Sequence, residues 1–156
     1  MSKLYSISRK QNIPTSIDDI WDFISSPQNL KNITPEYMDF KITSENLSEI
    51  MHTGMIIKYK VSPLLGIKLN WVTEITHLNE KKYFVDEQRF GPYKFWHHQH
   101  ILKIIDNGIE MTDIIHYKIP LGFIGDILNK FFINKQLKEI FDFRHKKIEE
   151  KFGVYQ

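Results

Sequence analysis

The sequence contains no cysteine and no alanine, and its only arginines are Arg9, Arg89 and Arg144. The absence of cysteine excludes disulfides, thiolate catalysis and zinc held by cysteine. Of the 21 basic residues 18 are lysines, and the formal net charge is +2. Proteins that read nucleic-acid sequences tend to be strongly basic and to use the planar arginine side chain, so no nucleic-acid partner is expected.

Long apolar runs are also missing. The longest, Ile119 to Gly125, is far shorter than the roughly 18 residues that a membrane-spanning helix needs. Residues 1–10 alternate and carry charge where a signal peptide would have an apolar run. We therefore expect a cytoplasmic protein without an integral membrane segment.

The length and composition fit one globular domain. The 156 residues suffice for a sizeable core but not for two domains of ordinary size. Apolar residues make up 42% and charged residues 26%, which argues against a disordered chain. No internal repeat or flexible linker divides the sequence, so we expect a single domain over residues 1–156.

The first 35 residues predict a strand followed by two short helices. Residues 3–12 alternate as in a strand, and Ser16 is a suitable N-cap for a helix that begins at Ile17. Pro27 can occupy the first position of a second short helix, which continues through Ile33.

Six more strands are expected before the period changes to that of a helix. Turn signals separate strands near 38–45, 54–61, 67–77, 82–90, 93–105 and 109–118. A helix of about 30 residues follows and ends at Gly153. Its apolar stripe runs through Ile124, Ile127, Leu128, Phe131, Leu137, Ile140, Phe141, Arg144, Ile148 and Phe152.

This order predicts an α+β fold. The connections between strands are short, which favours a seven-stranded antiparallel sheet, and the apolar face of the long helix must be buried against it. A strongly twisted sheet curves around such a helix. A single helix covers the concave surface incompletely, so a pocket is expected, although the 11 Phe, seven Tyr and three Trp could also fill it.

The last hairpin carries the most informative residues. Asn107-Gly108 predicts a type I′ turn, which places His100 opposite Ile115 and His98 opposite Tyr117. Side chains alternate along a strand, so one otherwise apolar face is expected to carry Trp96, His98, His100, Asp113 and Tyr117. On the preceding strands Trp71, Phe84, Asp86, Gln88 and Phe90 are expected to face the same interior.

Three interpretations of this polar cluster are open. It could be a structural network in which Asp113 orients His100, because buried polar groups are usually satisfied internally. It could hold the polar end of a hydrophobic ligand. His98, His100 and Asp113 also have the composition of a metal site with two histidines and one carboxylate, although this pattern alone is a weak signal. Motifs for serine hydrolases, zinc proteases and nucleotide binding are missing from the sequence.

In this arrangement the sequence resembles ligand-binding proteins of the SRPBCC superfamily, which have the START-like helix-grip fold, and in particular a branch often labelled cell division inhibitor. The resemblance covers nearly the whole chain. Its motifs are Trp21-Asp22-Phe23, Ser25, Pro27, Asn29-Leu30, Ile33-Thr34-Pro35, Gly54, Tyr59, Gly66, Trp71, Ile75, Phe84 to Gln88, Gly91-Pro92-Tyr93, Trp96, His98, His100, Met111-Thr112-Asp113, Tyr117, Pro120, Gly122 and Gly125.

The resemblance implies a curved seven-stranded sheet that grips the C-terminal helix around a hydrophobic cavity. Members bind or transfer lipids, sterols, quinones or polyketides, and some are cyclases or dehydratases. The leading hypothesis is a non-catalytic protein that binds a small hydrophobic molecule, without a cofactor or metal. Apolar contacts are expected from Trp71, Phe84, Trp96, Leu128 and Phe131, and polar contacts from His98, His100, Asp113, Tyr117 and Gln88.

Two alternatives remain. One is a cyclase-like or dehydratase-like enzyme that uses His98 or His100 with Asp113 for proton transfer. The other is an interaction module whose core is filled by aromatic side chains and which exposes an apolar patch.

Overall fold

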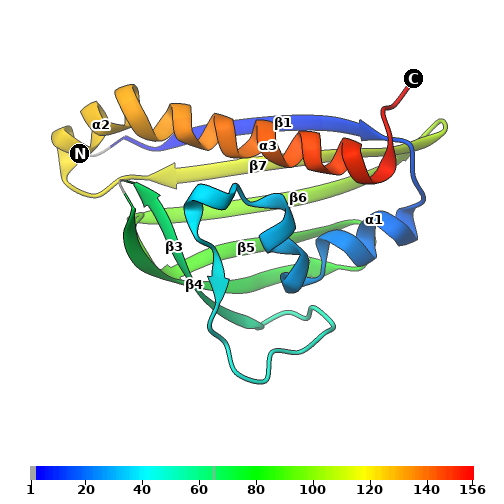
Figure 1. Cartoon of the computed structure of the whole chain (residues 1–156), viewed down its shortest axis with the longest axis horizontal. Coiled ribbons are helices and arrows are strands. Elements are labelled where there is room, and N and C mark those ends of the chain that lie inside the picture. Colours follow the sequence, from blue (N-terminus) through cyan, green and yellow to red (C-terminus); the bar gives the residue numbers. More distant parts are fainter. Residues whose placement is uncertain (1–2, 65) are drawn as a thin grey trace.

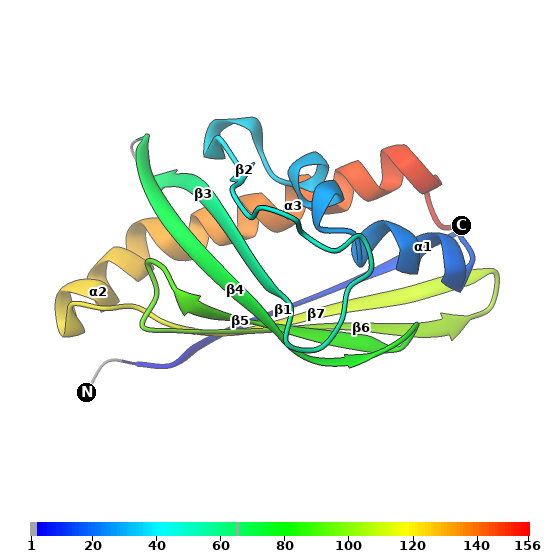
Figure 2. The same cartoon turned by 90° about the horizontal axis from the view of Figure 1, so that it is seen from below.

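The computed structural model describes residues 3–64 and 66–156. Within these residues the strands form one antiparallel sheet in the order β1-β7-β6-β5-β4-β3-β2, curved as Figures 1 and 2 show. The strands are β1 (Tyr5–Ile13), β2 (Lys41–Ile42), β3 (Ile56–Leu64), β4 (Ile67–Asn79), β5 (Tyr83–Phe90), β6 (Phe95–Ile105) and β7 (Gly108–Lys118).

The helices all lie on one side of the sheet (Figure 2). The helix α1 (Ile17–Ile24) and the 3-10 helices η1 (Pro27–Ile33) and η2 (Glu36–Met38) follow β1. The C-terminal helix consists of α2 (Gly122–Leu128), a π-helical turn η3 (Asn129–Ile133) and α3 (Asn134–Phe152). Together with the sheet, this arrangement confirms the predicted helix-grip fold.

Local signals place the first helices as predicted. The Ser16 hydroxyl accepts a hydrogen bond from the Asp19 amide at 3.1 Å, as an N-cap does, and Pro27 opens η1. The strand expected over 38–45 is different, because only Lys41 and Ile42 pair with β3. The backbone of Asp39 just before them is left-handed, with φ 44°, and this interrupts the extended conformation.

The β6–β7 hairpin differs from the predicted register by two residues. His100 lies opposite Asp113, and His98 lies opposite Ile115. Asn107 has the expected positive φ of 60°, but Gly108 is already the first residue of β7. Because side chains alternate with a period of two, the shift leaves every side chain on its predicted face.

The prediction that Leu128 and Phe131, in the first half of the C-terminal helix, face the sheet was wrong. A π-helical turn contains one more residue than an α-helical turn and therefore changes the phase of the helix. Phe131 is 60% exposed, and Leu128 is half-buried. Phe90 at the end of β5 is also exposed rather than inward, because the β4–β5 pairing shifts next to it, between Val72 and Thr73.

The α2 end of the molecule exposes an apolar patch. Figure 1 shows α2 at the left of the molecule, beyond the end of β7. The patch consists of Leu121, Phe123, Ile124, Ile127, Phe131 and Phe132, each between 44% and 74% exposed.

Candidate functional site

A cavity of about 180 Å³ lies between the sheet, η1 and α3. The core is therefore not filled by aromatic side chains, which corrects one of the alternatives. Apolar side chains form most of its wall, and the polar groups gather where β5 and β6 approach α3. The apolar part of the wall includes Leu30, Ile33, Met38, Phe40, Ile57, Val61, Trp71, Ile75, Phe84, Trp96, Leu137, Ile140 and Ile148.

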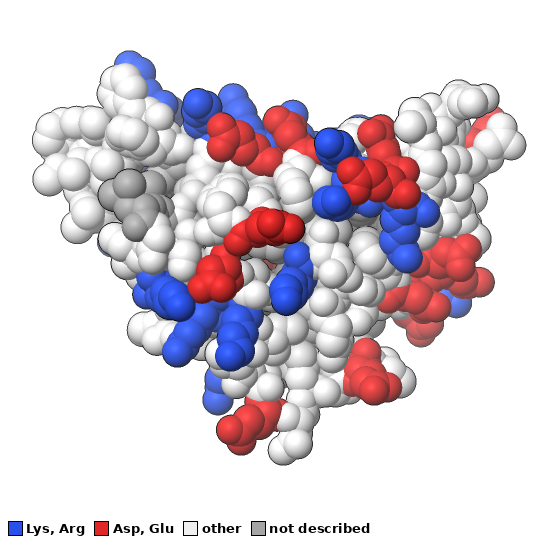
Figure 3. Space-filling model, in the orientation of Figure 1, with Lys and Arg blue, Asp and Glu red and all other residues white. Residues whose placement is uncertain are grey.

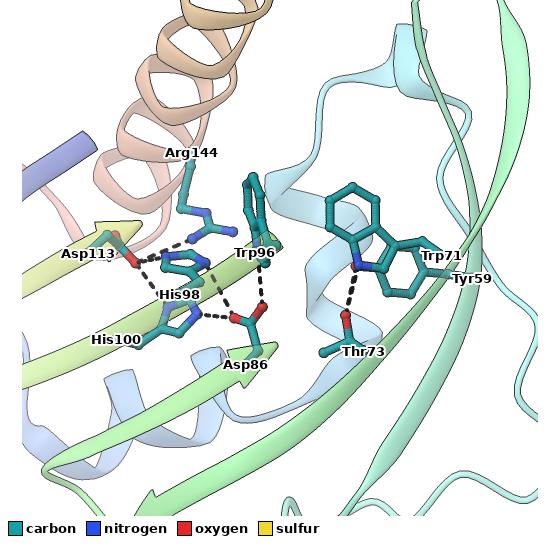
Figure 4. Close-up of polar contacts among 9 residues, drawn as sticks. All are labelled: Tyr59, Trp71, Thr73, Asp86, Trp96, His98, His100, Asp113 and Arg144. Carbon is teal, nitrogen blue, oxygen red and sulfur yellow. Dashed lines mark hydrogen bonds and ion pairs between the residues drawn. The ribbon is translucent and has the colours of Figure 1, made fainter. Parts of the chain in front are cut away.

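Aromatic rings in mutual contact form one wall of the cavity. The ring of Trp71 lies 5.3 Å from that of Trp96 and 5.5 Å from that of Tyr93, in both cases edge to face. The buried Thr73 hydroxyl accepts a hydrogen bond from Trp71 Nε1 at 3.1 Å and bonds the Tyr59 hydroxyl at 3.1 Å (Figure 4). These contacts fix the orientation of the rings that a ligand would touch.

Two histidines and two aspartates form a closed ring of polar contacts (Figure 4). Asp86 Oδ2 lies 3.3 Å from His98 Nδ1 and 2.8 Å from His100 Nε2. On the other side, Asp113 Oδ1 lies 3.0 Å from His98 Nε2 and 2.9 Å from His100 Nδ1. The two imidazole rings lie between two carboxylates, with 3.8 Å between their centroids.

The strand geometry explains why these four residues meet. His98 and His100 are two apart on β6 and therefore point to the same face. Asp113 faces His100 across the hairpin from β7, and Asp86 faces His98 from β5. His98, His100 and Asp113 are buried, and 17% of the Asp86 side chain is exposed.

Arg144 reaches the cluster from α3. Its Nη1 lies 3.6 Å from Asp113 Oδ1, and only 13% of its side chain is exposed. The guanidinium also lies over the ring of Phe141, 5.2 Å from its centroid. Among the described residues, its buried Nε has no hydrogen-bond partner. Arg144 therefore has hydrogen-bonding capacity left at the edge of the cavity, which it helps to line.

The two carboxylates favour the protonated form of His98. Its Nδ1 faces Asp86 Oδ2 at 3.3 Å, and its Nε2 faces Asp113 Oδ1 at 3.0 Å. Burial by itself lowers the pKa of His98, but Asp86 and Asp113 together raise it above its ordinary value.

The pKa values of the two carboxylates shift in the opposite direction. Burial raises the pKa of Asp86, but His98 and His100 outweigh burial and hold that pKa well below its ordinary value. Burial also raises the pKa of Asp113, but hydrogen bonds from both histidines and the charge of Arg144 outweigh it and hold that pKa well below the usual range. Both carboxylates are therefore ionised at neutral pH.

The structure brings some of the predicted site residues together and separates others. Trp71, Phe84, Trp96, His98 and His100 line the cavity, and Asp113 lies behind the two histidines. Leu128 and Phe131 do not line it, because the π-helical turn rotates them away.

Tyr117 and Gln88 also take other positions. The hydroxyl of Tyr117 donates to Asn129 Oδ1 at 2.9 Å, and the ring packs outside the cavity. The Gln88 amide bonds the backbone of Tyr93, with donation to its carbonyl at 2.6 Å and acceptance from its N–H at 3.1 Å. Gln88 therefore closes the turn at Gly91-Pro92.

The predicted set of site residues omitted Asp86 and Arg144. Asp86 was expected to face inward with Phe84, but it was not assigned to the cluster. Arg144 occupies a position in the apolar stripe of the C-terminal helix. A charged residue at a position that should be buried is a signal for a paired or functional group, and it could have identified Arg144.

Comparisons with known proteins identify the fold. The sequence matches no family model and no curated protein. Among solved structures, protein CV1439 from Chromobacterium violaceum has a TM-score of 0.72 at 12% identity, over 97% of this chain and 99% of its own. Ginseng major latex-like protein 151 from Panax ginseng has a TM-score of 0.69 at 13% identity, over 96% and 97%. TTHA0849 from Thermus thermophilus has a TM-score of 0.69 at 12% identity, over 95% and 97%.

These similarities extend over whole chains and confirm the helix-grip fold. They do not distinguish the branch labelled cell division inhibitor, which stays a prediction. None of the helices in the described residues is both long and apolar enough to span a bilayer.

Proposed function

We propose that this protein binds a small, mostly hydrophobic molecule in the cavity between the sheet and α3. The observation that carries the proposal is an open cavity of about 180 Å³ with an apolar and aromatic wall and a buried cluster of charged groups at one side. This combination is typical of ligand sites, where apolar contacts supply affinity and a few polar groups set the orientation. Lipids, quinones, sterols and polyketide-like molecules all fit this description.

The polar end of the ligand is expected to accept hydrogen bonds or to be anionic. Asp86 Oδ2 and Asp113 Oδ1 already contact histidine nitrogens, and Asp86 Oδ1 accepts from Trp96 Nε1. Arg144 Nε, in contrast, is buried without a partner among the described residues. A carboxylate, phenolate or carbonyl oxygen would supply the missing acceptor. Trp71 and Trp96 would then contact the apolar part of the molecule.

The first experiment is native mass spectrometry of the purified protein, which should detect a bound organic molecule. As a probe of defined structure, 1-anilinonaphthalene-8-sulfonate combines apolar rings with an anionic group, and it should bind one molecule per chain with increased fluorescence. Arg144→Met should weaken binding by about tenfold, the effect of losing roughly 1.4 kcal/mol from one charged contact.

A matched pair of variants tests the location of the probe. Ile140 lines the cavity and is half-buried, whereas Ile104 is 69% exposed at the far end of β6. Ile140→Trp should fill the cavity and abolish binding, and Ile104→Trp should leave it unchanged. Equal binding by both variants, or no binding of this probe and no copurified molecule in the parent protein, would refute the proposal.

An enzyme that transfers protons is the second candidate. The observation in its favour is that His98, His100 and Asp86 line the same cavity, so a bound molecule would lie beside imidazole groups. A cyclase or dehydratase activity of this kind should be lost in His100→Ala and strongly reduced in Asp113→Asn. A turnover that both variants retain at the parental rate would exclude this role.

A further inference from the structure

We propose that Asp86, His98 and His100 form a binding site for one divalent transition-metal ion. The three donor atoms lie within 4.8 Å of one another. Asp86 Oδ2 is 3.3 Å from His98 Nδ1 and 2.8 Å from His100 Nε2. Metal–ligand bonds of about 2.0–2.2 Å at tetrahedral angles place ligand atoms about 3.3 Å apart, so small side-chain movements suffice to admit an ion.

The groups behind these donors are arranged as the outer partners of a metal site. In such sites the second nitrogen of a ligating histidine usually bonds a carboxylate, which fixes the orientation of the ring. Here Asp113 Oδ1 lies at 3.0 Å from His98 Nε2 and 2.9 Å from His100 Nδ1, so one carboxylate orients both rings. Trp96 Nε1 donates to Asp86 Oδ1 at 3.3 Å, which leaves Oδ2 as the ligating oxygen.

The position of Arg144 selects the Asp86 side of the histidines over the Asp113 side. Asp113 Oδ1 also lies close to both rings, but the Arg144 guanidinium is only 3.6 Å from it and would repel a cation there. Asp86, His98 and His100 all line the cavity, whereas Asp113 does not. The remaining coordination position would therefore face the cavity and could be filled by water or by an oxygen of a ligand.

The donor set favours zinc, cobalt or ferrous iron over calcium or magnesium. Imidazole nitrogen suits transition metals, whereas calcium and magnesium prefer oxygen ligands. Two histidines and one carboxylate that leave a position open occur in sites of this class.

The test uses the full chain after dialysis against a chelator, with Zn²⁺ as the probe in isothermal titration calorimetry. We expect one ion per chain and a higher melting temperature of the parent protein in the presence of Zn²⁺. Titration with Co²⁺ should produce the visible absorption of a site with low coordination number. No saturable binding of either ion would overturn the proposal.

The variants distinguish this site from surface binding. Asp86→Asn removes one ligand and should weaken Zn²⁺ binding by at least 100-fold, while Asp113→Asn removes only the orienting carboxylate and should weaken it by 10-fold to 100-fold. His97→Gln is the matched control, because His97 points to the opposite face of β6, and it should bind as the parent does. Equal Zn²⁺ affinity of Asp86→Asn and His97→Gln would contradict the proposal.

A second ligand variant covers the case in which Asp86→Asn does not fold. His98→Gln replaces one donor and should also lose Zn²⁺ and Co²⁺ binding, and circular dichroism reports whether each variant is folded. The proposal is independent of the hydrophobic ligand, because the ions are added alone and the anionic fluorescent probe is tested in the presence of chelator.

Discussion

Thr73 is a single buried hydroxyl that connects two aromatic side chains of the cavity wall. It accepts a hydrogen bond from Trp71 Nε1 and bonds the Tyr59 hydroxyl, each at 3.1 Å. Polar groups in an apolar wall lower stability unless they have hydrogen-bond or ion-pair partners. The nearby histidines and aspartates meet this requirement by contacting one another. At the scale of residues, hydrogen bonds and ion pairs thus fix the histidines, the aspartates and Thr73 around the cavity, whereas Arg144 Nε has no partner among the described residues.

Thr73→Val preserves the shape of the side chain but removes this acceptor. Two buried groups, the Trp71 N–H and the Tyr59 hydroxyl, then lose their partner, and we expect the free energy of unfolding to fall by about 2–4 kcal/mol. Urea denaturation measures the change. In Tyr59→Phe the hydroxyl is absent, so the further cost of Thr73→Val should be smaller, and strictly additive effects would contradict this account.

Tyr93 makes the stability of the protein sensitive to high pH. Burial raises the pKa of Tyr93 well above its ordinary value of 10.0, and Tyr117 adds to the effect. Above about pH 10 the unfolded chain releases this proton while the folded protein retains it, so unfolding becomes more favourable as the pH rises.

Tyr93→Phe removes this contribution. The variant should lose less stability than the parent between about pH 9 and about pH 11, as measured by urea denaturation at each pH. An equal loss in both proteins would show that Tyr93 titrates normally.

Two short elements decide which side chains reach the site. The hairpin between β6 and β7 sets His100 opposite Asp113, and the π-helical turn η3 changes the phase of the C-terminal helix. After that turn, α3 directs Leu137, Ile140 and Arg144 into the cavity, while Phe131 stays exposed.

Gly108 is essential to the hairpin for a reason other than the predicted turn type. A Cβ atom at this position would collide with the backbone carbonyl of Ile13 on the neighbouring β1 strand. Gly108→Ala should therefore cost about 1–3 kcal/mol of unfolding free energy, because rigid backbone must move. Thermal or urea denaturation tests this.

Asn107→Gly supplies the comparison. Asn107 already has a positive φ, which glycine adopts readily, so this change should have a smaller effect than Gly108→Ala. The reverse order would show that the turn conformation, not the close approach of β1, limits this position.

The interior of the whole molecule combines buried hydrophobic clusters with a cavity. Around α1, the end of α3 packs closely against the sheet, and Ile148 is fully buried there with Ile20 and Trp21. The cavity lies between the sheet, η1 and α3, and Figure 2 shows β3 and β4 curving up towards the level of α3. Figure 3 shows lysines and acidic residues interspersed over the face that carries α3, in keeping with the small net charge.

The different burial of two isoleucines of α3 predicts different costs. Both line the cavity, but Ile148 is fully buried and Ile140 is half-buried. Ile148→Ala should lower the free energy of unfolding by about 2–5 kcal/mol, because it removes a completely buried side chain. Ile140→Ala should cost about 1 kcal/mol, because part of this side chain is already exposed to solvent. Urea denaturation of both variants checks this, and equal losses would contradict the difference in burial.

The sequence by itself determined the order of the elements, the fold class and the faces of the strands around His98, His100 and Asp113. These features depend on local signals, such as the Ser16 cap and the alternation along each strand, and alternation survives a register error of two residues. The tertiary structure alone decided that the cavity is open, that Asp86 and Arg144 join the histidines, and that Phe131 faces outward. These depend on sheet curvature and on one additional residue in a helical turn, which long-range packing selects and no local pattern encodes.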